Sequence, residues 1–291
     1  MTQWMIITLA AVAILAIFFV IVMLIDGNRF HVVKYNLTSN KIKKEHKYVI
    51  LSDLHNKSYG KKNEKLIKAI HELKPEAILI AGDMLTSKPG KSYETALNLL
   101  KELAGKYPIY YGMGNHETRL FLYPEVYGDM GVNYEKDLNA LQIELMRNES
   151  REEDDNIRIT GLDMNRDYYK RFKKFPMDST YLSCTLGEAR KETYEILLAH
   201  NPDYFEEYAA WGADLVFSGH VHGGMMRLPF LGGVVSPAVR LFPKYDGGLF
   251  RHGNSIMILS RGLGMHTIPI RIFNPGELVL VKLIPENNRK F

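Results

Sequence analysis

Five short apolar runs, each followed at once by a polar loop, are the feature that most constrains the fold of this chain. The runs have the length of buried β-strands, and the loops carry Asp, Asn and His. Because ligands of α/β sheets bind at the carboxyl ends of strands, we expect the loops to converge on one rim of a sheet. The loops are Asp53-Leu54-His55, Gly82-Asp83, Gly112-Met113-Gly114-Asn115-His116-Glu117, His200 and Gly219-His220-Val221-His222-Gly223-Gly224.

The segments between these loops predict an α/β fold. Residues 63–74 and 93–104 place apolar side chains at helical spacing, and Pro75 and Gly105 follow them. An alternation of strand, loop, helix and strand implies right-handed crossovers and a largely parallel sheet. The single cysteine, Cys184, excludes an internal disulfide and a thiolate metal cluster, and we expect it to be buried.

Taken together and in order, the five loops resemble the signature of the calcineurin-like metallophosphoesterases. That signature runs D-x-H, G-D, G-N-H-[DE], a lone His and G-H-x-H, and it is spread here from Asp53 to His222. Residues 227–230, 242–245 and 260–264 look like the bacterial membrane-associated phosphodiesterase subgroup, which includes proteins similar to UDP-diacylglucosamine hydrolases. The resemblance covers nearly everything beyond the first 45 residues and implies a four-layer α/β/β/α sandwich.

The resemblance also implies a role for each residue of the signature. Two divalent ions are expected, and Asp, Asn and His without thiolate suit Mn²⁺, Fe or Zn²⁺. One ion would be held by Asp53, His55 and His222, the other by Asn115, His200 and His220, with Asp83 bridging both. His116 would bind no metal and would stabilise or protonate the departing oxygen. Glu117 would lie in the second shell and orient the His116 ring.

The activity implied is metal-dependent phosphoric ester hydrolysis. A hydroxide that bridges the two ions would attack a phosphodiester or pyrophosphate, with a lipid-linked or nucleotide-lipid substrate as the class that the subgroup suggests. A nuclease or cyclic-nucleotide phosphodiesterase is the alternative enzyme, since the same centre serves those substrates. A nuclease would require a continuous basic groove and a steep salt dependence. A non-enzymatic membrane scaffold is the third reading, and it conflicts with the complete set of ligands.

Residues 4–25 form an apolar run without a charge, which predicts a membrane-spanning helix. The run is long enough to cross about 30 Å of hydrocarbon. A cleaved signal peptide is the competing reading, but no Lys or Arg precedes the run, which is longer than the usual apolar core of roughly 7–15 residues. Arg29, Lys34 and a lysine cluster follow it, so the catalytic domain is expected on the cytoplasmic face.

The domain organisation predicted from these features has four parts. Residues 1–26 form the transmembrane anchor, 27–46 a linker, 47–285 the metallophosphoesterase domain, and 286–291 a polar tail. Lysines of the linker would be attracted to anionic lipid headgroups. The expected partners are therefore the lipid bilayer and a phosphorylated small-molecule or lipid substrate, and no stable protein partner is inferred.

Two further segments have two interpretations each. Residues 165–175 mix aromatic and basic side chains, so they either cap the active site and receive a phosphorylated headgroup or nucleotide, or form a surface helix. Residues 225–250 are rich in Gly, Pro and apolar side chains. They either contact acyl chains of a bilayer or pack against the rim of the domain.

Overall fold

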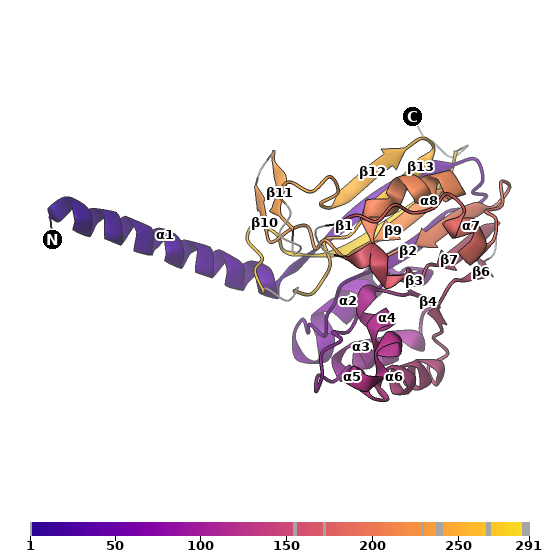
Figure 1. Cartoon of the computed structure of the whole chain (residues 1–291), viewed down its shortest axis with the longest axis horizontal. Coiled ribbons are helices and arrows are strands. Elements are labelled where there is room, and N and C mark those ends of the chain that lie inside the picture. Colours follow the sequence, from indigo (N-terminus) through magenta and orange to yellow (C-terminus); the bar gives the residue numbers. More distant parts are fainter. Residues whose placement is uncertain are drawn as a thin grey trace.

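Two six-stranded sheets form the body of the molecule in a computed structural model that describes residues 2–153, 156–170, 173–228, 230–236, 241–265 and 269–286 (Figure 1). The first sheet has the order β1 (Phe30–Ser39), β14 (Gly276–Pro285), β2 (His46–Leu51), β3 (Ala77–Ala81), β4 (Ile109–Gly112), β5 (Leu145–Met146). The second has the order β12 (Gly248–His252), β13 (Ser255–Leu259), β9 (Leu215–Ser218), β8 (Tyr194–Leu198), β7 (Ile157–Gly161), β6 (Glu149–Glu153). The predicted α/β class is confirmed.

Both sheets are mixed, which differs from the largely parallel sheet expected from the alternation of strands and helices. Two sheets with helices on their outer faces agree with the four-layer sandwich that the resemblance implied. Strands β2, β3, β4 and β5 run parallel to one another, and so do β7, β8, β9 and β13. Antiparallel pairs join β14 to β2, β6 to β7 and β12 to β13. The carboxyl ends of the parallel strands therefore provide two rims in place of one.

Three apolar clusters hold the layers together. One lies between the two sheets and includes Ile50 and Leu79 from the first sheet and Ile196 and Phe217 from the second. A second cluster joins the outer face of the first sheet to α2 (Glu64–Leu73), α3 (Glu94–Ala104), α4 (Asn115–Leu122) and α6 (Met130–Asn139). The third joins the second sheet to α7 (Tyr181–Leu186) and α8 (Phe205–Trp211). Helices thus cover the outer face of each sheet (Figure 1).

Helix α1 (Gln3–Asn28) projects away from one end of this body (Figure 1). It is long and apolar enough to cross a membrane, and a signal sequence would have the same character. Its side chains are exposed along most of its length, but Asp26 and Gly27 near its end are buried against the domain. The rings of Phe18 and Phe19 each lie 6.4 Å from the ring of Phe273.

The region expected to be a linker contains strand β1. Phe30–Ser39 pairs in parallel with β14 along its whole length, from Phe30 opposite Gly276 to Ser39 opposite Pro285. Its side chains alternate between partly buried and exposed positions, as expected for a strand at the edge of a sheet. Residues 30–39 are therefore part of the folded domain.

Several smaller expectations have different outcomes. The predicted helices at 63–74 and 93–104 correspond to α2 and α3. Cys184 is exposed on α7, so the prediction that it is buried is wrong. Within the aromatic-basic segment, residues 166–169 form the short helix η2 (Arg166–Tyr169), while residues 171 and 172 lie outside the described residues, as do residues 287–291 of the predicted tail.

Candidate metal centre

The predicted metal-binding side chains lie at the carboxyl ends of five parallel strands, three from one sheet and two from the other. Asp53 and His55 follow β2, Asp83 follows β3, and Asn115 is the first residue of α4 just after β4. His200 follows β8, and His220 and His222 follow β9. The strand-end placement agrees with the sequence prediction, although the centre lies where the ends of two sheets meet.

The backbone turns sharply at these strand ends. Five of the predicted ligands have a positive φ, which is uncommon for residues other than glycine but better tolerated by Asp, Asn and His. They are Asp53, His55, Asp83, His220 and His222. Such conformations cost about 1–3 kcal/mol each and persist where surrounding contacts fix them, which is typical of functional sites. The turns direct consecutive side chains toward one point.

The first group of candidate ligands is Asp53, His55 and His222, whose ligand atoms lie within 4.8 Å of one another. Nε2 of His222 is 3.2 Å from Oδ1 of Asp53. Nε2 of His55 is 3.1 Å from Nε2 of His222. Two nitrogens bound to one ion at about 2.0–2.1 Å lie at a similar separation, so this group fits a divalent ion.

The second group is Asp83, His200 and His220. Nδ1 of His200 donates a hydrogen bond of 2.6 Å to the carbonyl oxygen of Ala81, which leaves Nε2 as the ligand atom. That Nε2 lies 3.0 Å from Oδ2 of Asp83. The same oxygen lies 3.8 Å from Nε2 of His55 in the first group. Asp83 therefore lies between the two groups.

The buried charged groups of the centre also favour binding of a cation. Burial opposes ionisation of Asp53, but His222 and His200 outweigh this and hold the pKa of the Asp53 carboxyl below its ordinary value. Burial lowers the pKa of His200, yet the carboxylates of Asp83 and Asp53 outweigh it and raise this pKa to about 10. The buried carboxylates thus favour positive charge beside them, and a divalent ion supplies it without a proton on His200.

Asn115 adds an oxygen to the second group. Its side chain is buried, and among the residues that the structure describes its Oδ1 has no hydrogen-bond partner. An unpartnered buried oxygen is costly unless another ligand occupies it. The amide of Asn115 therefore fits a metal ligand.

His116 lies next to both groups but is held differently. Its ring centroid is 4.9 Å from that of His55, and with His55 and Asp83 it forms a third possible metal-binding group. However, the backbone N–H of Ser87 donates to Nδ1 of His116 at 2.9 Å. An acceptor Nδ1 assigns the proton of a neutral ring to Nε2, and burial lowers the pKa of His116, which favours the neutral ring. A ring with a proton on Nε2 donates a hydrogen bond and does not bind a metal through that atom.

Glu117 has a different role from the predicted orientation of the His116 ring. Its carboxylate accepts hydrogen bonds from the backbone N–H groups of Asp83, Met84 and Gly114 at 2.8–3.0 Å. The hydroxyl of Tyr111 also donates to it at 2.8 Å. Glu117 therefore fixes the loops that carry Asp83 and Asn115, while Ser87 orients His116.

Gly114 is required by the close approach of these loops. A Cβ at this position would collide with the carboxylate oxygens of Asp83 and Glu117. Oδ1 of Asp83 in turn accepts a hydrogen bond of 2.8 Å from the backbone N–H of His116. The glycine thus allows two strand-end loops to share one carboxylate.

Asn274 links the centre to the end of α1, a connection that the sequence did not indicate. Its Nδ2 donates to the carbonyl oxygens of His222 and Gly224 at 2.8 and 2.7 Å. Its backbone N–H donates to Oδ2 of Asp26 at 3.1 Å, and Oδ1 of Asp26 pairs with Arg29 at 2.7 Å. All these groups except the Arg29 side chain are buried. The end of α1 therefore contacts Asn274, the residue that holds the His222 loop in place.

Replacing Asn274 by Asp is expected to lower phosphoesterase activity about 10- to 100-fold. The new carboxylate would face two carbonyl oxygens and cease to hold the His222 loop, and losses of this size follow removal of groups that support metal ligands. Titration with Mn²⁺ should show weaker metal activation. Asn139→Asp, at the end of the remote helix α6, serves as the matched control. Unchanged metal activation in Asn274→Asp would rule out this positioning role.

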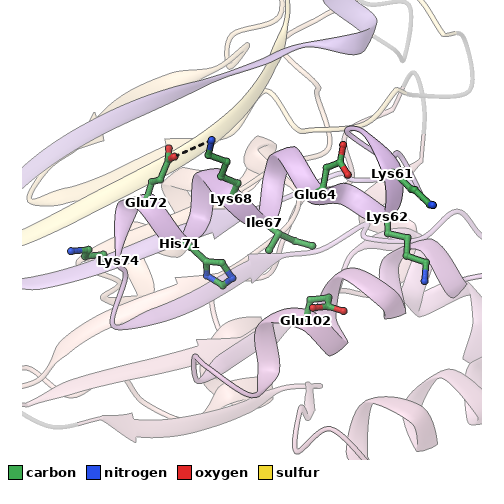
Figure 2. Close-up of a pocket in the computed structure, with 9 residues that line it drawn as sticks. All are labelled: Lys61, Lys62, Glu64, Ile67, Lys68, His71, Glu72, Lys74 and Glu102. Atoms are coloured by element: carbon green, nitrogen blue, oxygen red, sulfur yellow. Dashed lines mark ion pairs between the residues drawn. The ribbon is translucent and has the colours of Figure 1, made fainter.

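Two cavities differ in their relation to the centre. One of about 650 Å³ lies along α2 and is lined mainly by charged side chains, among them Lys68 and Glu72, which form an ion pair of 3.8 Å (Figure 2). None of the candidate ligands lines it. A smaller cavity of about 270 Å³ includes Asn115 in its wall and therefore adjoins the centre.

Comparison with known proteins gives a consistent result. The model of the calcineurin-like phosphoesterase family matches residues 46–224. An uncharacterized metallophosphoesterase of Helicobacter pylori is 28% identical over 256 residues, which cover 85% of this chain and 62% of that protein. The chain thus spans about three fifths of the length of this relative.

Two further relatives are covered more completely. The uncharacterized metallophosphoesterase YkuE of Bacillus subtilis is 28% identical over 256 residues, covering 83% of this chain and 80% of YkuE. The UDP-2,3-diacylglucosamine pyrophosphatase LpxG of Chlamydia muridarum is 23% identical over 269 residues, covering 77% of this chain and 78% of LpxG. Both alignments extend beyond the residues that the family model matches.

Proposed function

The chain belongs to the calcineurin-like phosphoesterase family, and we propose that it is a membrane-anchored, dinuclear enzyme that hydrolyses a phosphodiester or pyrophosphate bond. Metal-dependent phosphoesterase activity follows from the family and from the His/Asp cluster. The observation that carries the dinuclear proposal is the position of Asp83, whose Oδ2 lies 3.0 Å from His200 and 3.8 Å from His55. A carboxylate in that position is suited to bridging two ions.

In this proposal each ion has three ligands of its own. Asp53, His55 and His222 would hold one, Asn115, His200 and His220 would hold the other, and Asp83 would be shared. Two such ions, when bound, polarise phosphoryl oxygens and make a water nucleophilic near neutral pH. Oxygen and nitrogen ligands without thiolate fit Mn²⁺, Fe or Zn²⁺.

His116 acts on the substrate in the proposed reaction. Since Ser87 donates to Nδ1, the Nε2 proton is free to be donated to the oxygen that leaves phosphorus. His116 stands beside His55, so this donor is close to the metals without being one of their ligands. Glu117 contributes by holding the backbone of Asp83 and Gly114 in place.

Membrane attachment is supported by helix α1 and by apolar side chains on loops of the domain. Phe230, Leu231, Leu241 and Phe242 are exposed, and Phe273 packs against Phe18 and Phe19 of α1. In Figure 1 the hairpin of β10 (Met226–Leu228) and β11 (Gly232–Val235) lies beside the inner end of α1. We propose that these residues face the bilayer and that the basic residues after α1 keep the domain on the cytoplasmic side.

A lipid-linked or nucleotide-lipid substrate is proposed on two grounds. The active site would lie near the bilayer, because Asp26 at the end of α1 is joined through Asn274 to His222. LpxG, to which this chain is similar, is by its name a pyrophosphatase of UDP-2,3-diacylglucosamine. Activity that rises when the substrate is placed in mixed micelles or vesicles would support this class of substrate.

Treating the full-length protein with a chelator is expected to abolish hydrolysis of bis(p-nitrophenyl) phosphate, and Mn²⁺ should restore it. The whole chain in detergent is needed because Asp26 of α1 contacts the domain. Metal analysis should give two ions per chain in the active preparation. Chelator-resistant hydrolysis, or two bound ions without hydrolysis of any phosphodiester or pyrophosphate, would contradict the proposed function.

A further inference from the structure

A basic cavity opens directly beside the candidate metal centre. It has a volume of about 270 Å³, and its wall includes Asn115, Arg119, Arg166, Tyr169 and Lys170. Arg119 belongs to α4, the helix that begins with Asn115, and Arg166 and Tyr169 belong to η2. Residues from two segments more than 40 positions apart in the sequence thus form one cavity.

Tyr169 joins this cavity to the second group of ligands. Its ring centroid lies 5.3 Å from that of His220 and 6.2 Å from that of His200. Asn115, which also lines the cavity, is the proposed oxygen ligand of the same group. A molecule bound in the cavity would therefore lie next to a phosphoryl group held at the metals.

The two arginines of the cavity carry positive charge that no described carboxylate pairs with. Within the described part of the chain, neither Arg119 nor Arg166 has a carboxylate partner, and the guanidinium of Arg166 lies over the Tyr123 ring at 4.7 Å. Lys170 is different, because its Nζ pairs with Asp167 at 2.7 Å. The two arginines are thus the side chains available to an anion.

Acidic groups do not cancel this charge. No Asp or Glu lines the cavity in the part of the chain that the structure describes. Asp163 accepts a hydrogen bond of 2.6 Å from Thr118, a wall residue, but it also pairs with Arg147 at 3.5 Å. An anion with several oxygens matches the paired donors of two guanidinium groups.

We propose that this cavity binds a second phosphate group of the substrate, so that the substrate is a diphosphate ester. One phosphate would lie at the metals, and the adjoining phosphate would be held by Arg119 and Arg166. This inference rests on the proposed function and selects the pyrophosphate bond from its two alternatives. Hydrolysis breaks the P–O–P bond, adds the hydroxyl of water to one phosphorus and the proton to the other phosphate, and so yields two monophosphates.

The size of the cavity favours a diphosphate over a nucleic acid. A nuclease needs a continuous basic groove that contacts several phosphates. Here two free guanidinium groups share one small cavity, and the exposed apolar side chain of Leu122 forms part of its wall. One additional phosphate and the start of an attached group would fill this space.

Calorimetric binding of α,β-methylene-ADP and of AMP to the Mn²⁺-loaded full-length protein in detergent tests the proposal. The wild type should bind the non-hydrolysable diphosphate at least about tenfold more tightly than the monophosphate. Arg119→Gln and Arg166→Gln should each weaken binding of the diphosphate about 10- to 100-fold, the loss expected for a hydrogen bond to a charged group, and should weaken AMP less. Arg166→Lys should restore part of the preference.

Controls separate this proposal from the proposed function and from misfolding. Arg251→Gln, at an exposed arginine of β12, should retain the preference for the diphosphate. Circular dichroism checks that each variant is folded. Because Arg166 is exposed, Arg166→Gln tests the second-phosphate site by itself if Arg119→Gln is unstable. A wild type without the preference, or variants that both keep it, would overturn the second-phosphate site. Hydrolysis of bis(p-nitrophenyl) phosphate by the same wild-type preparation shows independently whether the phosphoesterase itself is active.

Discussion

Replacing Asp83 by Asn is expected to reduce kcat/KM for phosphodiester hydrolysis by about three orders of magnitude or more. Asp83 is the carboxylate between the two groups of ligands, with Oδ2 near both His200 and His55. An amide has no negative charge, so its oxygen does not hold two divalent ions as a carboxylate oxygen does. Metal ions supply several kcal/mol of transition-state stabilisation, and each 1.36 kcal/mol corresponds to about a tenfold change in rate.

The metal content of the Asp83→Asn protein distinguishes this explanation from a simple loss of fold. We expect elemental analysis to show fewer than two ions per chain while circular dichroism shows an intact fold. Asp178→Asn is the matched control, because Asp178 is exposed and bonds to Thr180. A variant with two bound ions and more than about a tenth of wild-type activity would show that Asp83 does not bridge the metals.

The part of the site that could be predicted from the sequence is the part carried by contiguous motifs. The candidate ligands follow buried or largely apolar strands such as β3 and β8 within a few residues, so an apolar run marks their positions. The sheet to which each run belongs was not predictable in this way. Two apolar runs of similar composition give the same sequence pattern whether their strands join one sheet or belong to two facing sheets. Leu79 and Ile196 come from two such runs, and both lie in the apolar layer between the sheets.

Strand β1 was missed because an edge strand with one exposed face lacks a continuous apolar run. Its pairing with β14 joins residues nearly 250 positions apart, for example Phe30 and Gly276. The supports of the centre were missed for a related reason. Ser87 bonds to His116 from 29 positions away, and Asn274 bonds to His222 from 52 positions away. Contacts of this kind leave no periodic pattern in the sequence.

The error about Glu117 also has a physical cause. Sequence adjacency suggested that its carboxylate would meet the ring of His116, but both residues lie in the first turn of α4, where neighbouring side chains point in different directions. The carboxylate of Glu117 instead accepts hydrogen bonds from the backbone N–H groups of Asp83 and Met84. Those bonds stabilise the strained turn at Asp83, whose φ is 55°.

Replacing His116 by Ala is expected to lower kcat about 10²- to 10⁴-fold while both metal ions stay bound. This range is typical for the loss of a general acid or base. The expectation rests on the hydrogen bond from the Ser87 backbone N–H to Nδ1, which assigns the proton to Nε2 and makes the ring a donor toward the substrate. The measurement is kcat together with metal content for the wild type and the variant.

The leaving group provides a sharper test of the same role. A donor to the departing oxygen matters most when that oxygen is strongly basic, so His116→Ala should impair alkyl phosphodiesters more than p-nitrophenyl phosphodiesters. His71→Ala is the matched control, since His71 lies on α2 and bonds to Tyr107, away from the centre. Because His116 also lies within ligand distance of His55 and Asp83, loss of a metal ion in His116→Ala would assign it to the metal centre. An equal loss of rate for both leaving groups, with two ions bound, would leave His116 as a binding residue and not as the donor to the leaving oxygen.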